Sequence, residues 1–182
     1  PSYIELTKKH VPDIQKYVSS TGSPMYYTAL IAKEKYPDAK TVFIGPCMAK
    51  RKEAKDNPNV DYVLTFEELA SIIGGLDINI DSVTPYSMTC ASVKEAHGFA
   101  AAGGVTQAVK VFLNKADLNA LQVSNLNKKN IGLLRAYAKT GKCPSPFIEV
   151  MACEGGCAAG PCIRTDKATS QKRLQQALKK FD

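Results

Sequence analysis

The sequence predicts an α/β fold with a mainly parallel sheet flanked by helices. Short apolar segments that suit strands alternate with longer segments that carry helix start and stop signals. This alternation is typical of layered folds in which helices connect parallel strands. A length of 182 residues suits one domain, or one lobe of a larger protein, with a hydrophobic core of its own.

The N-terminal segment is expected to be helical. Apolar side chains recur at helical spacing over residues 2–18, and Pro12 divides this stretch or restarts it at a new first turn. Ser23 followed by Pro24 is a helix cap followed by a first-turn proline, so a second helix is expected from there to about Lys35.

Two strands and a capped helix are expected next. The strands are apolar runs at residues 40–44 and 62–64. Thr65 and Glu68 fit a capping box, in which each side chain bonds the other residue's backbone N–H. The helix that they start is expected to end near residue 73, where two glycines follow.

Residues 77–99 have no sustained period and are expected to form a long loop with short helical turns. After it, apolar spacing and stop signals predict a helix at 106–114, a strand at 118–123, a helix at 126–140, a strand at 147–151 and a polar helix at 166–181.

The composition excludes several classes of protein. No apolar run approaches the roughly 18 residues of a membrane span, and no secretory signal is visible. The net charge of +7 comes mainly from lysines that suit a solvated surface, and no aromatic platform, zinc-finger spacing or arginine cluster indicates nucleic-acid binding. Six cysteines without a secretory signal favour a reducing compartment, so we expect a cytoplasmic protein without membrane or nucleic-acid partners.

Cysteines follow two of the expected strands. Cys153, Cys157 and Cys162 lie in a glycine-rich loop after one strand, and Cys47 lies just beyond another. In a parallel sheet such loops meet at the carboxyl edge, so Cys47, Cys153 and Cys157 are expected to bind a metal or an iron–sulfur cluster together. A fourth thiolate could come from Cys162, or from Cys90 or Cys143. Buried free thiols in a tight turn, or a zinc site, are the alternatives.

Two of these loops resemble signature loops of the iron-only ([FeFe]) hydrogenases. The family form M-P-C-x-x-K-x-x-E corresponds to residues 45–53, GPCMAKRKE, with Gly45 in place of Met. The form E-x-M-A-C-x-x-G-C corresponds to residues 149–157, EVMACEGGC. Residues 61–69 and the stretch 99–105, FAAAGGV, are also similar to the family. The resemblance implies that the fold is one lobe of the iron-only hydrogenase fold.

The resemblance implies a cofactor, a reaction and roles for particular residues. The cofactor is the H-cluster, a [4Fe–4S] cluster bridged to a two-iron subcluster, which interconverts dihydrogen with protons and electrons. Cys47, Cys153 and Cys157 would be metal ligands, with Cys157 bridging the two parts. The two-iron unit would be contacted by Lys50, Met151, Phe99 and Ala100. Protons would pass along Glu53, Ser19 and Ser23, and electrons would come from a ferredoxin or an attached iron–sulfur domain.

The first family loop ends in C-C-P, and Pro1 resembles the last residue of that motif. The resemblance then implies that residues 1–182 are a C-terminal fragment of the catalytic domain, starting just after the first cluster motif. The fourth ligand and the proton-delivering thiol would precede Pro1, so we expect the isolated chain to be inactive and free of cluster. Gly45 and the tail AAGPC at residues 158–162 resemble divergent members. A sensory module and an iron–sulfur assembly scaffold are therefore the alternatives to an enzyme.

Overall fold

The structure is a computed structural model that describes residues 1–86 and 93–181. The described residues form four strands, β1 (Val42–Gly45), β2 (Tyr62–Thr65), β3 (Ala120–Ser124) and β4 (Phe147–Met151). They form the α-helices α1 (Ser2–His10), α2 (Pro24–Lys35), α3 (Lys50–Lys55), α4 (Phe66–Gly75), α5 (Lys94–Gly98), α6 (Gly104–Phe112), α7 (Lys128–Thr140) and α8 (Lys167–Leu178). Short 3-10 helices are η1 (Pro12–Tyr17), η2 (Ile80–Ser82), η3 (Cys157–Ala159) and η4 (Lys179–Phe181).

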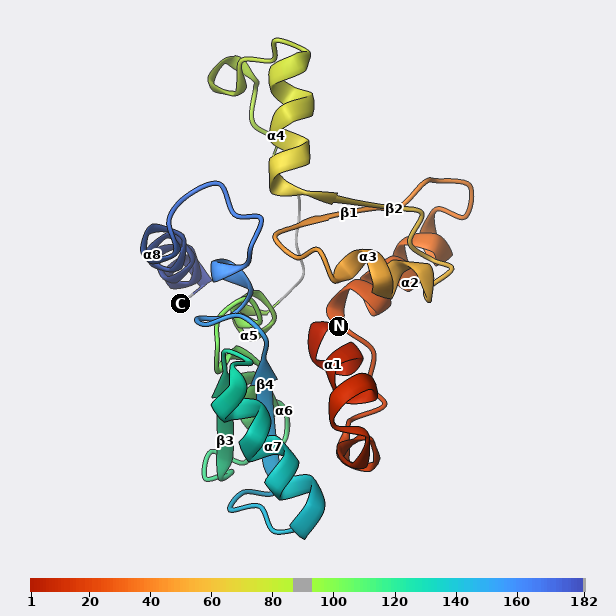
Figure 1. The fold of residues 1–182 in the computed structure, drawn as a ribbon. Helices are drawn as coiled ribbons and strands as arrows, with labels where there is room; N and C mark the ends of the chain where they lie inside the picture. Colours follow the sequence, from red (N-terminus) through yellow and green to blue (C-terminus); the bar gives the residue numbers. More distant parts are fainter. Residues whose placement is uncertain (87–92, 182) are drawn as a thin grey trace.

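The α/β class and the parallel pairing are confirmed, but the strands form two small sheets. β1 pairs with β2, with Ile44 opposite Leu64, and β3 pairs with β4, with Val123 opposite Val150. Each sheet is a strand–helix–strand unit, since α3 connects β1 to β2 and α7 connects β3 to β4. The two sheets lie in different parts of the molecule (Figure 1). The expectation that the cysteine loops share one sheet edge is therefore wrong, because they leave two different sheets.

The predicted helix caps explain where several helices begin and end. Ser23 caps α2 by accepting a hydrogen bond from the Tyr26 N–H, and both halves of the Thr65 capping box are present at α4. α7 ends at Gly141, which has a left-handed backbone (φ 66°) that glycine adopts without strain.

Two helix predictions need correction. Residues 50–55, for which no helix was predicted, form α3, whose only apolar residue is Ala54 and which therefore has no visible apolar period. α4 continues through the two glycines to Gly75.

Residues 77–99 agree with the expected loop with short helical turns in the part that the structure describes. They contain η2 and α5, and residues 87–92 within this stretch lie outside the described part of the chain.

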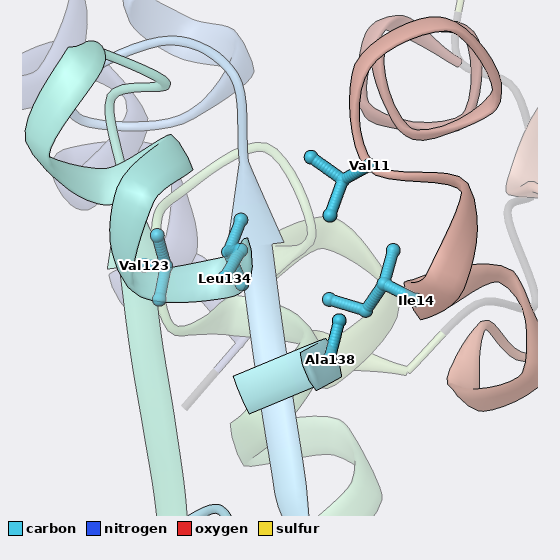
Figure 2. Packing of buried hydrophobic residues seen from close by; sticks show 5 residues of the cluster. All are labelled: Val11, Ile14, Val123, Leu134 and Ala138. Atoms are coloured by element: carbon cyan, nitrogen blue, oxygen red, sulfur yellow. The ribbon is translucent and has the colours of Figure 1, made fainter. Parts of the chain in front are cut away.

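Two clusters of buried side chains support the two sheets. One joins Val11 and Ile14 of the N-terminal segment to Val123 of β3 and to Leu134 and Ala138 of α7. In Figure 2, Val11 and Ile14 point across the interface toward the α7 side chains. The N-terminal segment is thus fixed against the β3–β4 unit.

The second cluster, Met25, Ala29 and Val60, packs α2 against the β1–β2 unit. Phe43 of β1 and Val63 of β2 cover this cluster from the sheet side. No helix in the described ranges is long and apolar enough to cross a membrane.

The capping box predicts a pH-dependent stability. Hydrogen bonds from the Thr65 backbone, together with Arg51, lower the pKa of Glu68 from 4.5 to about 2. A lowered pKa stabilises the folded state fully above the unfolded value, and this stabilisation is lost as pH falls toward 2. We expect Glu68→Gln to lower the free energy of unfolding at pH 6, and the difference from wild type to shrink as pH falls from 4.5. Urea unfolding at several pH values measures this, with the exposed Glu67→Gln as control. A difference that does not vary with pH would contradict the prediction.

Candidate metal centre

Two cysteine-bearing loops meet although they leave different sheets. Cys47 follows β1, and Cys153, Cys157 and Cys162 follow β4. The Cys162 N–H donates a hydrogen bond of 3.3 Å to the carbonyl of Pro46, the residue before Cys47. Gly160 also packs closely against this carbonyl, because a Cβ added at Gly160 would lie 2.7 Å from the Pro46 oxygen. The backbone thus brings the Cys47 loop and the loop after β4 together.

The predicted wall segment, Phe99 and Ala100, lies against the same loop. The Ala158 N–H donates to the Ala100 carbonyl at 3.0 Å. Gly156 has a left-handed backbone (φ 87°), and a Cβ at this position would lie 2.6 Å from Ala100 O. Only glycine can occupy this position without displacing backbone, so the loop carrying Cys157 lies directly on the Phe99–Ala100 segment.

The three predicted thiol ligands influence one another electrostatically. Loss of surrounding water raises the pKa of Cys157, and the charges of Cys47 and Cys153 raise it further, whereas Lys50 lowers it. Burial, and then the charge of Cys47, raise the pKa of Cys153, while Lys167 lowers it. The charge of Cys47 thus reaches both other thiols, and Cys157 is exposed whereas the other two are half-buried.

An iron–sulfur cluster needs a different site from a single metal ion. In residues 1–86 and 93–181, no group of three His, Cys, Asp or Glu side chains is close enough to hold one metal ion. An iron–sulfur cluster spreads its thiolate ligands over several iron atoms, and it needs loops that leave room for it. Three thiols from two loops, beside close-packed glycine backbone, fit the donor chemistry of such a cluster.

The other cysteines are placed differently. Cys162 is only 6% exposed and lies behind Cys47, where burial and the nearby charges of Glu67 and Cys47 raise its pKa. Cys143 is exposed in the loop between α7 and β4. Cys90, the third candidate for a fourth ligand, lies outside the described residues.

Lys50, Glu53 and Ser23 form a connected group of hydrogen bonds. The Lys50 ammonium lies 2.7 Å from Glu53 Oε2 and donates to Ser23 Oγ at 2.9 Å, and the Ser23 hydroxyl donates to the other Glu53 oxygen, Oε1. The charged side chains are mostly shielded, with exposures of 13% for Lys50 and 19% for Glu53. The helix α3 places Lys50 and Glu53 one turn apart, and the cap of α2 supplies Ser23.

Ser19 and Met151 are less closely connected to this group. Ser19 is exposed, and its hydroxyl accepts a hydrogen bond from the Thr21 N–H. Met151 is the half-buried last residue of β4, two residues before Cys153. The structure thus brings together Ser23 and Glu53 of the predicted proton route with Lys50, which was predicted to contact the two-iron unit, and it places Ser19 in the loop leading to Ser23.

Ser23 serves both helix α2 and this hydrogen-bonded group. Its hydroxyl accepts from the Tyr26 N–H and donates to Glu53. We expect Ser23→Ala to lower the free energy of unfolding by about 1.5 kcal/mol, since a lost N-cap costs roughly 0.5–2 kcal/mol. Urea unfolding measures this, with the exposed Ser20→Ala in the preceding loop as matched control. Equal effects of the two substitutions would contradict the capping role.

Glu149 is a structural residue of the site to which sequence analysis gave no role. It lies on β4 and is only 5% exposed. Its carboxylate accepts three hydrogen bonds, from the Gly103 N–H and the Thr106 N–H at 2.8 Å each and from the Thr106 hydroxyl at 2.6 Å. It thereby binds the N-terminus of α6, whose positive dipole end favours an anion. Its position as the first residue of the motif EVMACEGGC, residues 149–157, was the feature of the sequence that could have pointed to a role.

A cleft opens beside Cys153. Its volume is about 510 Å³, and it lies between the loop after β4 and the first turn of α8. Lining residues include Cys153, Glu154, Pro161 and Lys167. The cleft gives the Cys153 side of the candidate centre a route to the surface.

Comparisons with known proteins identify similar sequences and similar folds. A sequence profile described as "Iron only hydrogenase large subunit, C-terminal domain" matches residues 1–161. Iron hydrogenase 1 of Clostridium pasteurianum is 28% identical over 88% of this chain, and the NADP-reducing hydrogenase subunit HndD of Solidesulfovibrio fructosivorans is 26% identical over 96%. A variant of the [FeFe]-hydrogenase HydA1 from Chlamydomonas reinhardtii has a similar fold, with a TM-score of 0.69 over 98% of this chain at 20% identity.

The chain corresponds to only part of these proteins. It spans 36% of the Clostridium protein, 38% of the Solidesulfovibrio protein and 64% of the Chlamydomonas chain. The matched part includes Cys47, Cys153 and Cys157, and it ends one residue before Cys162.

Proposed function

This chain belongs to the iron-only hydrogenase large subunit family, and from this premise we propose that it holds part of a hydrogenase H-cluster. The observation that carries the proposal is the meeting of the Cys47 loop with the Cys153–Cys157 loop, which gathers three thiols beside Lys50. Within a protein that completes the site, the activity is reversible interconversion of protons and electrons with dihydrogen. The chain is thus the C-terminal part, residues 1–182, of an oxidoreductase catalytic domain.

The residues present would hold the cofactor in the following way. Cys47, Cys153 and Cys157 would supply thiolate ligands for a [4Fe–4S] cluster, and Cys157 would be the ligand on the side of the two-iron subcluster. That two-iron unit, when bound, supplies the hydrogen chemistry. Phe99, Ala100 and Met151 exclude water from this side of the site.

Lys50, Glu53 and Ser23 would serve the site through charge and protons. The Lys50 ammonium is a cation suited to an anionic ligand, and it holds the Glu53 carboxylate in place. The Ser23 hydroxyl already donates to Glu53 Oε1, so a proton can move from Oγ to the carboxylate when Oγ receives another. Ser19, in the loop before Ser23, would connect this group to solvent.

Partners and location follow from the same proposal. The electron partner would be a ferredoxin or an attached iron–sulfur domain. The cytoplasm would be the location, because a reducing compartment suits a chain whose described cysteines are free thiols. A sensory module that binds the cluster with little turnover is the second candidate. An assembly scaffold is disfavoured because Lys50, Glu53 and Met151, which would serve the two-iron unit, are present.

Anaerobic reconstitution with iron and sulfide tests the proposal. We expect the isolated chain to bind little iron, and added small thiol, which can supply a missing ligand, to raise the bound iron and sulfide. Under the latter condition Cys153→Ser or Cys157→Ser should lower bound iron at least about fivefold, because each removes a ligand. Cys143→Ser, at an exposed cysteine away from the loops, is the matched control. Absorption spectra and metal analysis measure the outcome.

Two results would overturn parts of the proposal. Iron binding that is insensitive to Cys153→Ser and Cys157→Ser would remove the ligand assignment, and zinc in place of iron would remove the cluster. Full four-iron loading with hydrogen evolution by the isolated chain would contradict the expectation that it is inactive alone.

A further inference from the structure

The described structure places the backbone of a second, buried cysteine against the loop of a proposed cluster ligand. Cys162 is 6% exposed, and its backbone N–H is bonded to the carbonyl of the residue before Cys47. We propose that Cys47 and Cys162 form a redox-active pair that closes to a disulfide when the cluster is absent.

The backbone geometry favours this particular pairing. The hydrogen bond joins Cys162 to Pro46, and Cys47 is the next residue, so main-chain contact brings the two cysteines into neighbouring segments. A disulfide between them needs α-carbons about 4.4–6.8 Å apart. The contact is also rigid, since a Cβ added at Gly160 would lie 2.7 Å from Pro46 O and 3.0 Å from Cys157 O. The two cysteines are therefore held as neighbours by main chain and not by flexible side chains.

Burial assigns different roles to the two thiols. Cys47 is half-buried, so a small reagent can reach it, whereas Cys162 is shielded and reacts only with a neighbour. A reachable thiol beside a sheltered one is the usual arrangement of an attacking and a resolving cysteine. Disulfides in reducing compartments are mostly transient and redox-sensing, which suits a pair of this kind.

The chemistry balances with a low-molecular-weight disulfide as oxidant. The Cys47 thiolate attacks one sulfur of the reagent, forms a mixed disulfide and releases the first reagent thiol. The Cys162 thiolate then attacks the Cys47 sulfur, forms the Cys47–Cys162 bond and releases the second. The two protein thiols lose two electrons and two protons, and the reagent disulfide is reduced to two thiols.

The consequence for cluster binding rests on the proposed function. A sulfur in a disulfide has no thiolate charge to offer iron, so the oxidised chain lacks one of its proposed ligands. Oxidation would then block loading until a reductant reopens the pair. The disulfide itself does not depend on the chain being a hydrogenase.

Mass spectrometry of the cluster-free chain, treated with oxidised glutathione in defined ratios to reduced glutathione, tests the pairing. We expect a species that has lost the mass of two hydrogen atoms, with the peptides containing Cys47 and Cys162 linked. In Cys162→Ser the mixed disulfide with glutathione should persist at Cys47. Cys143→Ser should still form the Cys47–Cys162 link, since Cys143 lies between α7 and β4, outside the two loops that meet. Absence of the Cys47–Cys162 peptide, or equal amounts of Cys47 linked to Cys153 or Cys157, would overturn the proposal.

Iron loading with added small thiol separates this inference from the proposed function. The glutathione-oxidised chain, freed of reagent, should bind at least about fivefold less iron than the reduced chain, and the Cys162→Ser chain, with its mixed disulfide first removed by reductant, should bind as much as reduced wild type. If reduced wild type binds no iron, the proposed function fails while the disulfide stands. If the oxidised and reduced chains bind equal iron, the effect of the pair on loading is refuted.

Discussion

Glu149→Ala will lower the free energy of unfolding by about 3 kcal/mol, because it leaves buried donors without an acceptor. The Glu149 carboxylate accepts from the N–H groups of Gly103 and Thr106 and from the Thr106 hydroxyl. Each bond to a buried charge contributes more than an ordinary hydrogen bond, and the N-terminus of α6 also loses its anion. The loss outweighs the gain from no longer burying a carboxylate, since the partners stay in place.

Urea unfolding measures this effect, provided that the slope of the unfolding free energy against urea concentration is the same for both proteins. Glu154→Ala is the matched control, since Glu154 lies in the next loop but is exposed, and we expect a change below about 0.5 kcal/mol. Glu149→Gln should recover only part of the loss, because its amide NH2 group faces N–H donors. A Glu149→Ala protein as stable as Glu154→Ala would show that water satisfies the end of α6.

Local signals in the sequence predicted the elements that depend on neighbouring residues. Ser23–Pro24, the Thr65–Glu68 box and Gly141 fix helix ends through contacts within a few residues, and all three were found where expected. α3 was missed because a short basic helix with one alanine has no apolar period. Residues outside α3 stabilise it: Arg51 pairs with Glu68 of α4, and Lys50 donates a hydrogen bond to Ser23.

The candidate centre could also be predicted only as far as local sequence signals reach. The order of cysteines and glycines predicted which loops matter, but it did not predict that they leave two separate sheets. Their meeting depends on the bond from Cys162 to Pro46, across more than a hundred residues. The Glu149–Thr106 contacts likewise join residues 43 apart. Such pairings follow from tertiary packing, which periodicity and capping do not encode.

Leu134→Ala will also destabilise the fold strongly, by about 3 kcal/mol within the usual 2–5 kcal/mol for a buried leucine. Leu134 lies on α7 with a solvent exposure of 0%, and it belongs to the cluster that joins Val11 and Ile14 to Val123 (Figure 2). Truncation removes apolar contacts and leaves a cavity between α7, the N-terminal segment and β3. Close-packed surroundings from three separate elements cannot all collapse to fill it.

Leu133 supplies the control, because it is also a leucine of α7 and is the residue next to Leu134. Leu133 is 36% exposed, so Leu133→Ala should cost less than about 1 kcal/mol in urea unfolding. Equal losses for the two leucines would mean that helix propensity, and not core packing, decides the effect. A large difference would show that α7 fixes the N-terminal segment to the β3–β4 unit, whose β4 carries Glu149 and leads directly to Cys153. Core packing at Leu134 would then be a condition for the geometry of the candidate centre.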